Sequence, residues 1–315
     1  AYMQEKNFKE AIWSWDEATK LKPNFFQAYF GKGNAYSDLK DYSNAINNFK
    51  KDKEINKNYK EAYNNLGTLY ANLKDYKNAL IIFKKAVLIK PVHFNEFNNL
   101  GNVYYELNKY KDSIENYNLA IKINPDFALT YYNKAKALQK VNFIEESIIN
   151  YEKAISLNKN FSEAYQNLGN IYMDLKILDK SIYNHKKALK INPGIKFLLG
   201  TIIQSKYGMC DWDNFEYESK FLEKEILGGK KSASPFSTLL IYDSPSLQLK
   251  SSNIFLESEF QASNWTKKEK VRNKKIRVAY YSSDFHNHAT MYLMANLFEL
   301  HDKSKFEIYA FSFGP

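Results

Sequence analysis

Residues 60–93 read KEAYNNLGTLYANLKDYKNALIIFKKAVLIKPVH, and this stretch decides the fold because its pattern recurs along the chain. Gly67, Ala79, Phe83 and Pro91 each have a counterpart of similar type 34 residues away. One column holds small residues at Gly33, Gly67, Gly101, Ala135 and Gly169, and another holds rings at Trp15, Phe49, Phe83, Tyr117, Tyr151 and His185. A fixed period of this length predicts a solenoid, in which stacked units bury a core that no unit could bury alone.

The spacing resembles that of the tetratricopeptide repeat, whose pattern W-x₂-L-G-x₂-Y, A-x₃-F and P also has a period of about 34 residues. We therefore expect an all-α array over residues 1–195, with a partial first repeat followed by repeats 26–59, 60–93, 94–127, 128–161 and 162–195. In each repeat, two antiparallel helices should meet at the small residues, and the rings should fill the spaces between units. His185 occupies the aromatic column, so we expect a packing role for it. Ala1 falls in the middle of an expected helix, which predicts further sequence upstream.

A column of amides accompanies the repeats. It reads Gly31, Asn65, Asn99, Asn133 and Asn167, two residues beyond a packed position and therefore about 200° around the helix. This places it on the concave side, where amides could hold the backbone of an extended polypeptide, since each offers a donor and an acceptor. Asparagine is abundant throughout the chain, so chance recurrence is the alternative interpretation.

Composition and charge argue against a membrane-spanning, a secreted or a nucleic-acid-binding protein. The chain has 315 residues, 44% of them hydrophobic and 25% charged, without an apolar run long enough to span a membrane. A single cysteine, Cys210, and the absence of a signal-peptide pattern favour a cytoplasmic protein. Of the net charge of +10, +6 falls within residues 267–277, so the basic character belongs to a short linker and does not favour nucleic-acid binding.

Beyond Pro193 the repeat pattern stops. Residues 195–228 and 246–260 read as helices of a connector over 196–265, followed by a basic linker over 266–274. Residues 275–281 and 305–313 have the pattern of strands on either side of a helix over 291–300, which is the first βαβ unit of an α/β domain over 275–315. One such unit cannot cover both faces of a sheet, so we expect further sequence downstream.

A polar loop follows the first expected strand, and ligands bind at the carboxyl ends of strands in open α/β sheets. It contains Asp284, His286, Asn287 and His288. Their spacing differs from known zinc motifs and no cysteine joins them, so no metal site is expected. An ordinary surface loop, a polar ligand site and a proton-transfer site all remain open from these residues alone.

Residues 276–288, IRVAYYSSDFHNH, resemble the opening of the catalytic region of the O-linked N-acetylglucosamine transferases, most closely their bacterial SPINDLY-like members. The similarity continues through residues 293–294, 297–302 and 306–315, and the segments at 210–212 and 235–249 resemble the connector of that family. Repeats, connector and strand–loop motif also follow one another in the order found in the family.

This resemblance implies an inverting, metal-independent glycosyltransferase with two Rossmann-like lobes, which transfers a sugar from a UDP- or GDP-linked donor to Ser or Thr of a protein. UDP-N-acetylglucosamine is the expected donor, no cofactor is expected, and the donor-binding residues would lie beyond Pro315. His288 matches the active-site histidine of the family, as a base or as a positioning group, with Asp284 and Asn287 on the same loop. Tyr292 stands where the family often has a second histidine.

The family also implies that the groove presents the acceptor protein through Asn65, Asn99, Asn133 and Asn167. A non-catalytic scaffold that binds peptides through its repeats is the alternative function. Neither nucleic acid nor a membrane is expected as a partner.

Overall fold

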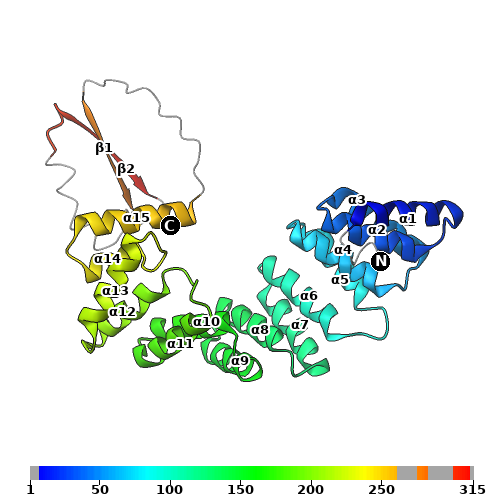
Figure 1. Ribbon diagram of the computed structural model, residues 1–315, viewed down its shortest axis with the longest axis horizontal. Helices are drawn as coiled ribbons and strands as arrows, with labels where there is room; N and C mark the ends of the chain where they lie inside the picture. Colours follow the sequence, from blue (N-terminus) through cyan, green and yellow to red (C-terminus); the bar gives the residue numbers. More distant parts are fainter. Residues whose placement is uncertain (1–6, 261–274, 283–300, 313–315) are drawn as a thin grey trace. The chain divides into compact units, whose positions relative to one another are not determined.

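A computed structural model describes residues 7–260, 275–282 and 301–312, which fall into two compact units, Ala1–Glu259 and Phe260–Pro315. The first unit is entirely helical where it is described, and Figure 1 shows its helices in chain order from blue α1 to yellow α15. The helices of the repeats are α1 Phe8–Leu21, α2 Phe26–Asp38, α3 Tyr42–Ile55, α4 Lys60–Asn72, α5 Tyr76–Ala86, α6 Phe94–Glu106, α7 Tyr110–Ile123, α8 Ala128–Lys140, α9 Ile144–Leu157, α10 Ser162–Asp174 and α11 Leu178–Ile191. The connector follows with α12 Leu198–Gly208, α13 Phe215–Leu227, α14 Pro235–Ile241 and α15 Pro245–Glu259.

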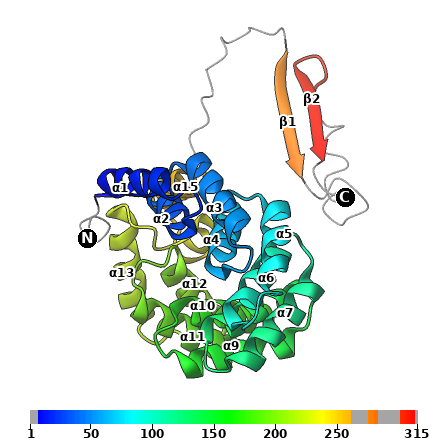
Figure 2. The same ribbon diagram turned by 90° about the vertical axis from the view of Figure 1, so that its right-hand side faces the viewer.

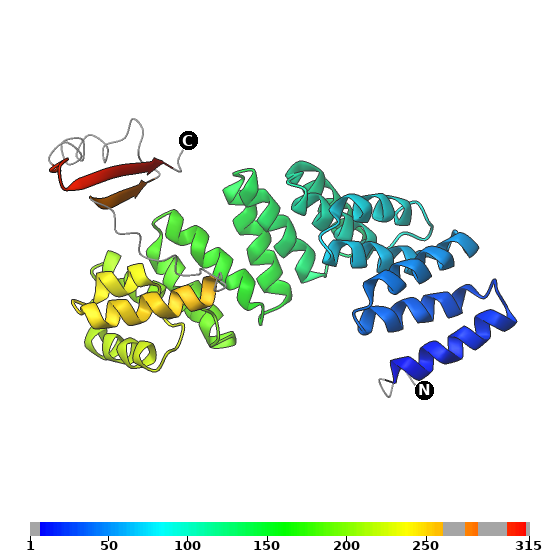
Figure 3. The same cartoon turned by 90° about the horizontal axis from the view of Figure 1, so that it is seen from above.

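The helices α2 to α11 form five successive antiparallel pairs, visible as adjacent ribbons in Figure 3. The columns of the repeat explain the pairing. A Cβ added to Gly67 would come within 2.8 Å of the Phe83 ring of the same pair, so only glycine lets the ring lie this close. In the next repeat the small residue of the second helix adds a hydrogen bond, because the Ser113 hydroxyl donates to the Gly101 carbonyl at 2.8 Å. These contacts confirm that the small residues mark the closest approach of the two helices.

The turn inside each repeat has a constant backbone geometry. The second residue after the end of each first helix adopts a left-handed conformation, with φ between 58° and 62°, at Lys40, Lys74, Asn108, Asn142 and Lys176. This is the usual way to end a helix, and asparagine tolerates it better than lysine does. The three lysine turns therefore carry some backbone strain that the two asparagine turns largely avoid.

His185 packs as a core residue, as its column predicts. It is fully buried, its Nε2 lies 3.0 Å from the Asn170 Oδ1, and its Nδ1 lies 3.4 Å from the Ser181 hydroxyl. Burial lowers the pKa of the imidazole to about 4, so the ring is neutral near pH 7. A neutral ring that donates from Nε2 and accepts at Nδ1 satisfies both contacts.

Asp52 breaks the pattern of the repeats. It stands on α3 at a position where the equivalent residues, Ala86, Ala120 and Ala154, are completely buried alanines. The Asp52 side chain is also completely buried, and neither carboxyl oxygen has a hydrogen-bond partner among the described residues. Burial, with Glu61 nearby, raises the pKa of this carboxyl to about 7.

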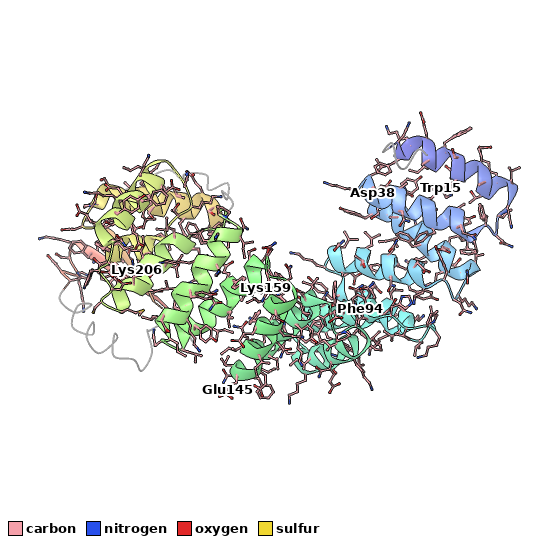
Figure 4. All side chains as sticks on the ribbon, turned by 60° about the horizontal axis from the view of Figure 1, so that its bottom comes forward. Trp15, Asp38, Phe94, Glu145, Lys159 and Lys206 are labelled. Atoms are coloured by element: carbon pink, nitrogen blue, oxygen red, sulfur yellow. The ribbon has the colours of Figure 1, made fainter. Side chains whose placement is uncertain are left out.

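The prediction of a single helix over residues 195–228 of the connector is wrong. Two helices, α12 and α13, are separated by a loop in which Cys210 and Asn214 adopt left-handed conformations. The almost fully buried Lys206, labelled in Figure 4, anchors the loop through the Asp213 carbonyl at 2.8 Å. Its Nζ also pairs with Glu218 at 2.9 Å, so one buried ammonium joins the loop to α13.

The described part of the second unit contains two strands, β1 Ile276–Ser282 and β2 Phe306–Ser312. The two strands run in the same direction, as Figure 2 shows, and they pair with Ile276 opposite Phe306 and Ser282 opposite Ser312. Both expected strands are thus confirmed to within one residue at each end, whereas the expected helix over 291–300 lies outside the described residues. None of the described helices has the length and apolar character needed to cross a bilayer.

Candidate functional site

A row of hollows runs over the first helices of the repeats, α2, α4, α6 and α8. Their volumes are about 170 Å³ between α2 and α4, 260 Å³ between α4 and α6, and 350 Å³ between α6 and α8. Thr68 and Asn72 line both of the first two hollows, and Asn102 and Glu106 line both of the last two. Neighbouring hollows therefore share walls and form one continuous depression, which we call the repeat groove.

Three amides of the expected column line the repeat groove, one in each hollow: Asn65, Asn99 and Asn133. All three are partly exposed. The Asn65 amide donates to the Asn34 Oδ1 at 2.8 Å, and the Asn133 amide donates to the Asn102 Oδ1 at 3.1 Å. These bonds use one N–H of Asn65 and one of Asn133 and orient both groups, while no described residue bonds to the other N–H or to the carbonyl oxygen of either amide. Their part in binding stays a prediction.

The ends of the amide column depart from this arrangement. Asn167 lines none of the three hollows, and its amide donates to the Tyr132 hydroxyl at 3.3 Å and the Tyr151 hydroxyl at 3.2 Å. At the other end, the Trp15 ring lies where a side chain on Gly31 would have to be. The column therefore presents three groove amides, and Asn167 is tied to two tyrosines of the preceding repeat.

The neighbouring asparagines, one position earlier, have a structural role. The Asn64 amide donates to Glu96 at 2.9 Å, and Asn98 is buried and accepts from the Thr130 hydroxyl at 3.1 Å. Both bonds join one repeat to the next. Recurrence of asparagine therefore does not by itself indicate a binding surface, because the direction of the side chain decides its role.

The groove also contains charged residues that the sequence-based search did not single out. The Lys136 ammonium lies 4.9 Å from the centre of the Tyr105 ring and 5.7 Å from that of Tyr132. Glu106 lines the same hollow as Lys136 and the neighbouring one, where it accepts from the Tyr76 hydroxyl at 3.2 Å, and desolvation and this carboxylate raise the pKa of Tyr76. The repeat could have pointed to Lys136, because it stands three residues after Asn133 in the sequence. Asn34 and Asn102, which also line the groove, stand at the same position of their own repeats.

This arrangement suits the recognition of an extended chain. Amides that offer both donors and acceptors can pair with successive peptide groups, whatever their side chains. Glu106 and Lys136 both line the hollow between α6 and α8 and carry opposite charges, so they can discriminate between the side chains of a ligand.

The candidate active-site residues Asp284, His286, Asn287 and His288 lie outside the described residues, and so does Tyr292. Their roles stay predictions. Within the described ranges, no cluster of three or more His, Cys, Asp or Glu side chains is placed to hold a metal ion.

Comparison with known families agrees with the repeat pattern. Models of the tetratricopeptide repeat match residues 26–59, 60–93, 128–161 and 150–183, and a related TPR-repeat model matches residues 1–40 and 101–142. The model of glycosyl transferase family 41 matches residues 246–315, from α15 to the end of the chain. No curated protein matches the chain.

Two solved structures are similar to part of this chain in fold. A chain of the APC/C Cut9–Hcn1 hetero-tetramer has 17% identity and a TM-score of 0.53, with 65% of this chain and 40% of that chain covered. A double mutant of MamA from the strain RS-1 has 21% identity and a TM-score of 0.51, with 53% and 94% covered. At these identities the similarity concerns the fold alone. The chain is therefore a tetratricopeptide-repeat protein whose C-terminal residues 246–315 resemble glycosyl transferase family 41.

Proposed function

We propose that this chain is part of a protein O-glycosyltransferase, which transfers a sugar from a nucleotide-sugar to Ser or Thr of a protein held in the repeat groove. UDP-N-acetylglucosamine is the donor we favour, and inversion at the sugar carbon is the stereochemistry. The observation that carries the proposal is the match of residues 246–315 to glycosyl transferase family 41, directly after an array of tetratricopeptide repeats.

The groove supports the acceptor side of this proposal. Its amides are spaced one repeat apart, so a long extended segment would meet Asn65, Asn99 and Asn133 in turn. An extended acceptor exposes its Ser and Thr hydroxyls, which a sugar-transferring enzyme must reach. We assign His288 to the reacting end of the acceptor, as the base that takes the hydroxyl proton or as a group that positions the hydroxyl, with Asp284 and Asn287 on the same loop.

The test uses the protein in its full natural reading frame. Incubation with UDP-N-acetylglucosamine and a library of Ser- and Thr-containing peptides should give products heavier by one sugar residue, read by mass spectrometry. His288→Ala should abolish the product while acceptor-peptide binding stays unchanged. Neither product nor donor binding by calorimetry, with GDP- as well as UDP-sugars, would refute the enzymatic proposal.

A peptide-binding scaffold without catalysis is the second candidate, and the groove itself favours it, because the amides that would hold a peptide all lie in the repeats. The double variant Asn99→Ala/Asn133→Ala tests peptide binding by either candidate. Each amide that loses a hydrogen bond to a peptide costs about 1 kcal/mol, so the dissociation constant should rise at least tenfold.

The matched control removes two exposed asparagines of the second helices, Asn47→Ala/Asn118→Ala, and should leave the affinity unchanged. Equal affinities of the two double variants would exclude the groove amides from binding. Binding that depends on the amides, in a full-length protein that transfers no sugar, would identify the scaffold.

A further inference from the structure

We propose that a cleft among α11, α12 and α13, outside the repeat groove, binds an acidic protein segment that inserts a bulky apolar side chain. The cleft consists of two adjoining hollows of about 530 Å³ and 290 Å³. Leu189 of α11, Leu199 of α12 and Phe221 of α13 line both hollows and form their common wall. Volumes of this size accommodate one or two large side chains.

The packing of the connector explains the cleft. The helix α12 packs against both α11 and α13, and its buried residues Ile202 and Ile203 belong to different apolar clusters, one with α11 and one with α13. Between those clusters, apolar side chains remain accessible. Tyr217 is 76% exposed and Phe221 is 45% exposed, one turn apart on the same face of α13. An apolar floor beside two accessible aromatic rings is typical of sites that anchor a partner.

The charges around the cleft select the partner. Lys186, Lys190 and Lys231 line it and form no ion pair with any residue that the structure describes. The two lining carboxylates are already engaged, because Glu218 pairs with Lys206 and Glu225 with Lys230, at 2.9 Å and 2.8 Å. The unpaired charge among the lining residues is therefore positive.

A lysine rim around an apolar floor complements a segment that carries Asp or Glu on both sides of a Phe, Leu or Trp. The basic residues 267–277 of this chain, with a charge of +6, would be repelled and are excluded as the occupant. An anionic bilayer would also attract the lysines, but it does not fit the shape of the site. A cleft receives a side chain from its partner, whereas a membrane-binding site needs side chains that protrude from the protein into the bilayer.

The experiment measures binding to the 315-residue chain by fluorescence anisotropy. The probe is a fluorescein-labelled dodecapeptide of Asp and Glu with one central Phe, and its partners are the same peptide with Ala for Phe and with Lys for the acids. We expect saturable binding of the probe alone, weakened by added salt. The variants Lys186→Glu/Lys190→Glu and Phe221→Ala should each raise the dissociation constant at least tenfold.

Two control variants lie on the same helices but do not line the cleft. Lys187→Glu reverses an exposed charge on α11, and Leu227→Ala removes an exposed apolar side chain of α13. Both should bind the probe like the unmodified chain, and circular dichroism should verify that every variant is folded. Absence of saturable binding, equal weakening by the control variants, or binding only to vesicles of phosphatidylserine and phosphatidylcholine would each overturn the proposal.

Discussion

Replacing Asp52 by alanine should stabilise the repeat array, and the gain should increase as the pH rises. The side chain occupies a column of buried alanines, is itself completely buried, and has no hydrogen-bond partner for its carboxyl oxygens among the described residues. Its pKa is raised from the ordinary value of 3.8 to about 7, chiefly because burial penalises the charged form and secondly because Glu61 is nearby.

The size of the effect follows from linkage between ionisation and folding. Below pH 3.8 the carboxyl is protonated in both the folded and the unfolded chain and costs nothing through ionisation. As the pH rises the unfolded chain releases its proton first, so the free energy of unfolding falls until the pH passes about 7. At about 1.4 kcal/mol per pH unit over that interval, the loss amounts to about 4 kcal/mol. This is an upper bound, since a small shift of α3 would let the carboxylate reach water.

The assay is urea unfolding of the chain and of Asp52→Ala at several pH values between 4 and 8, followed by circular dichroism. Hydrogen exchange of the amides in α3 and α4 locates the change. We expect a gain of about 2–4 kcal/mol at pH 8 and a gain below about 1 kcal/mol at pH 4. Glu54→Ala is the control, because Glu54 is an exposed acid on the same helix. A gain independent of pH, or destabilisation at pH 8, would refute the reasoning.

Three further predictions concern stability. The stability difference between the chain and His185→Phe should shift by about 3 kcal/mol against the chain between pH 6.5 and pH 4, because the pKa of His185 is lowered to about 4 and the unfolded chain takes up a proton first; a difference that does not change with pH would contradict this. Lys74→Gly should raise the free energy of unfolding, measured in urea, by up to about 1 kcal/mol, because the φ of 59° at this position suits glycine. The control Lys50→Gly, within α3, should lower the free energy of unfolding by a similar amount. Glu96→Ala should cost about 3–5 kcal/mol in urea unfolding, because it removes the carboxylate at 3.7 Å from the buried Lys60 ammonium and leaves that charge only the Pro91 carbonyl at 2.6 Å; a cost below about 1 kcal/mol would show that the ion pair is dispensable.

The helix pairs of the repeats could be predicted from the sequence because the contacts that define them are repeated. Gly67 and Phe83 are near in sequence, and the same pair of residue types recurs at Gly33 with Phe49 and in altered form at Gly101 with Tyr117. A contact that depends on two residue types at constant separation leaves a periodic trace, and the structure confirms it.

The groove was only partly predictable. Asn133 and Asn167 occupy equivalent positions in the sequence pattern, yet Asn133 lines a hollow and Asn167 donates to two tyrosines. The difference arises because the hydroxyls of Tyr132 and Tyr151 lie within reach of Asn167 only after the helices have packed. A column of identical residues therefore identifies candidate positions, while the surrounding side chains decide which amides are available.

The sequence by itself determined the repeat, its period, the two strands of the second unit and the family resemblance, because each of these is encoded in local spacing. Only the tertiary structure decided which asparagines face the groove, that no described residue offers the buried Asp52 carboxyl a hydrogen bond, and that Leu189, Leu199 and Phe221 meet in one cleft. Those features depend on side chains that packing brings together from different helices or on the exclusion of water. The reason is physical: periodic patterns specify how a helix meets its nearest neighbour, whereas burial and charge at one atom depend on every group packed around it.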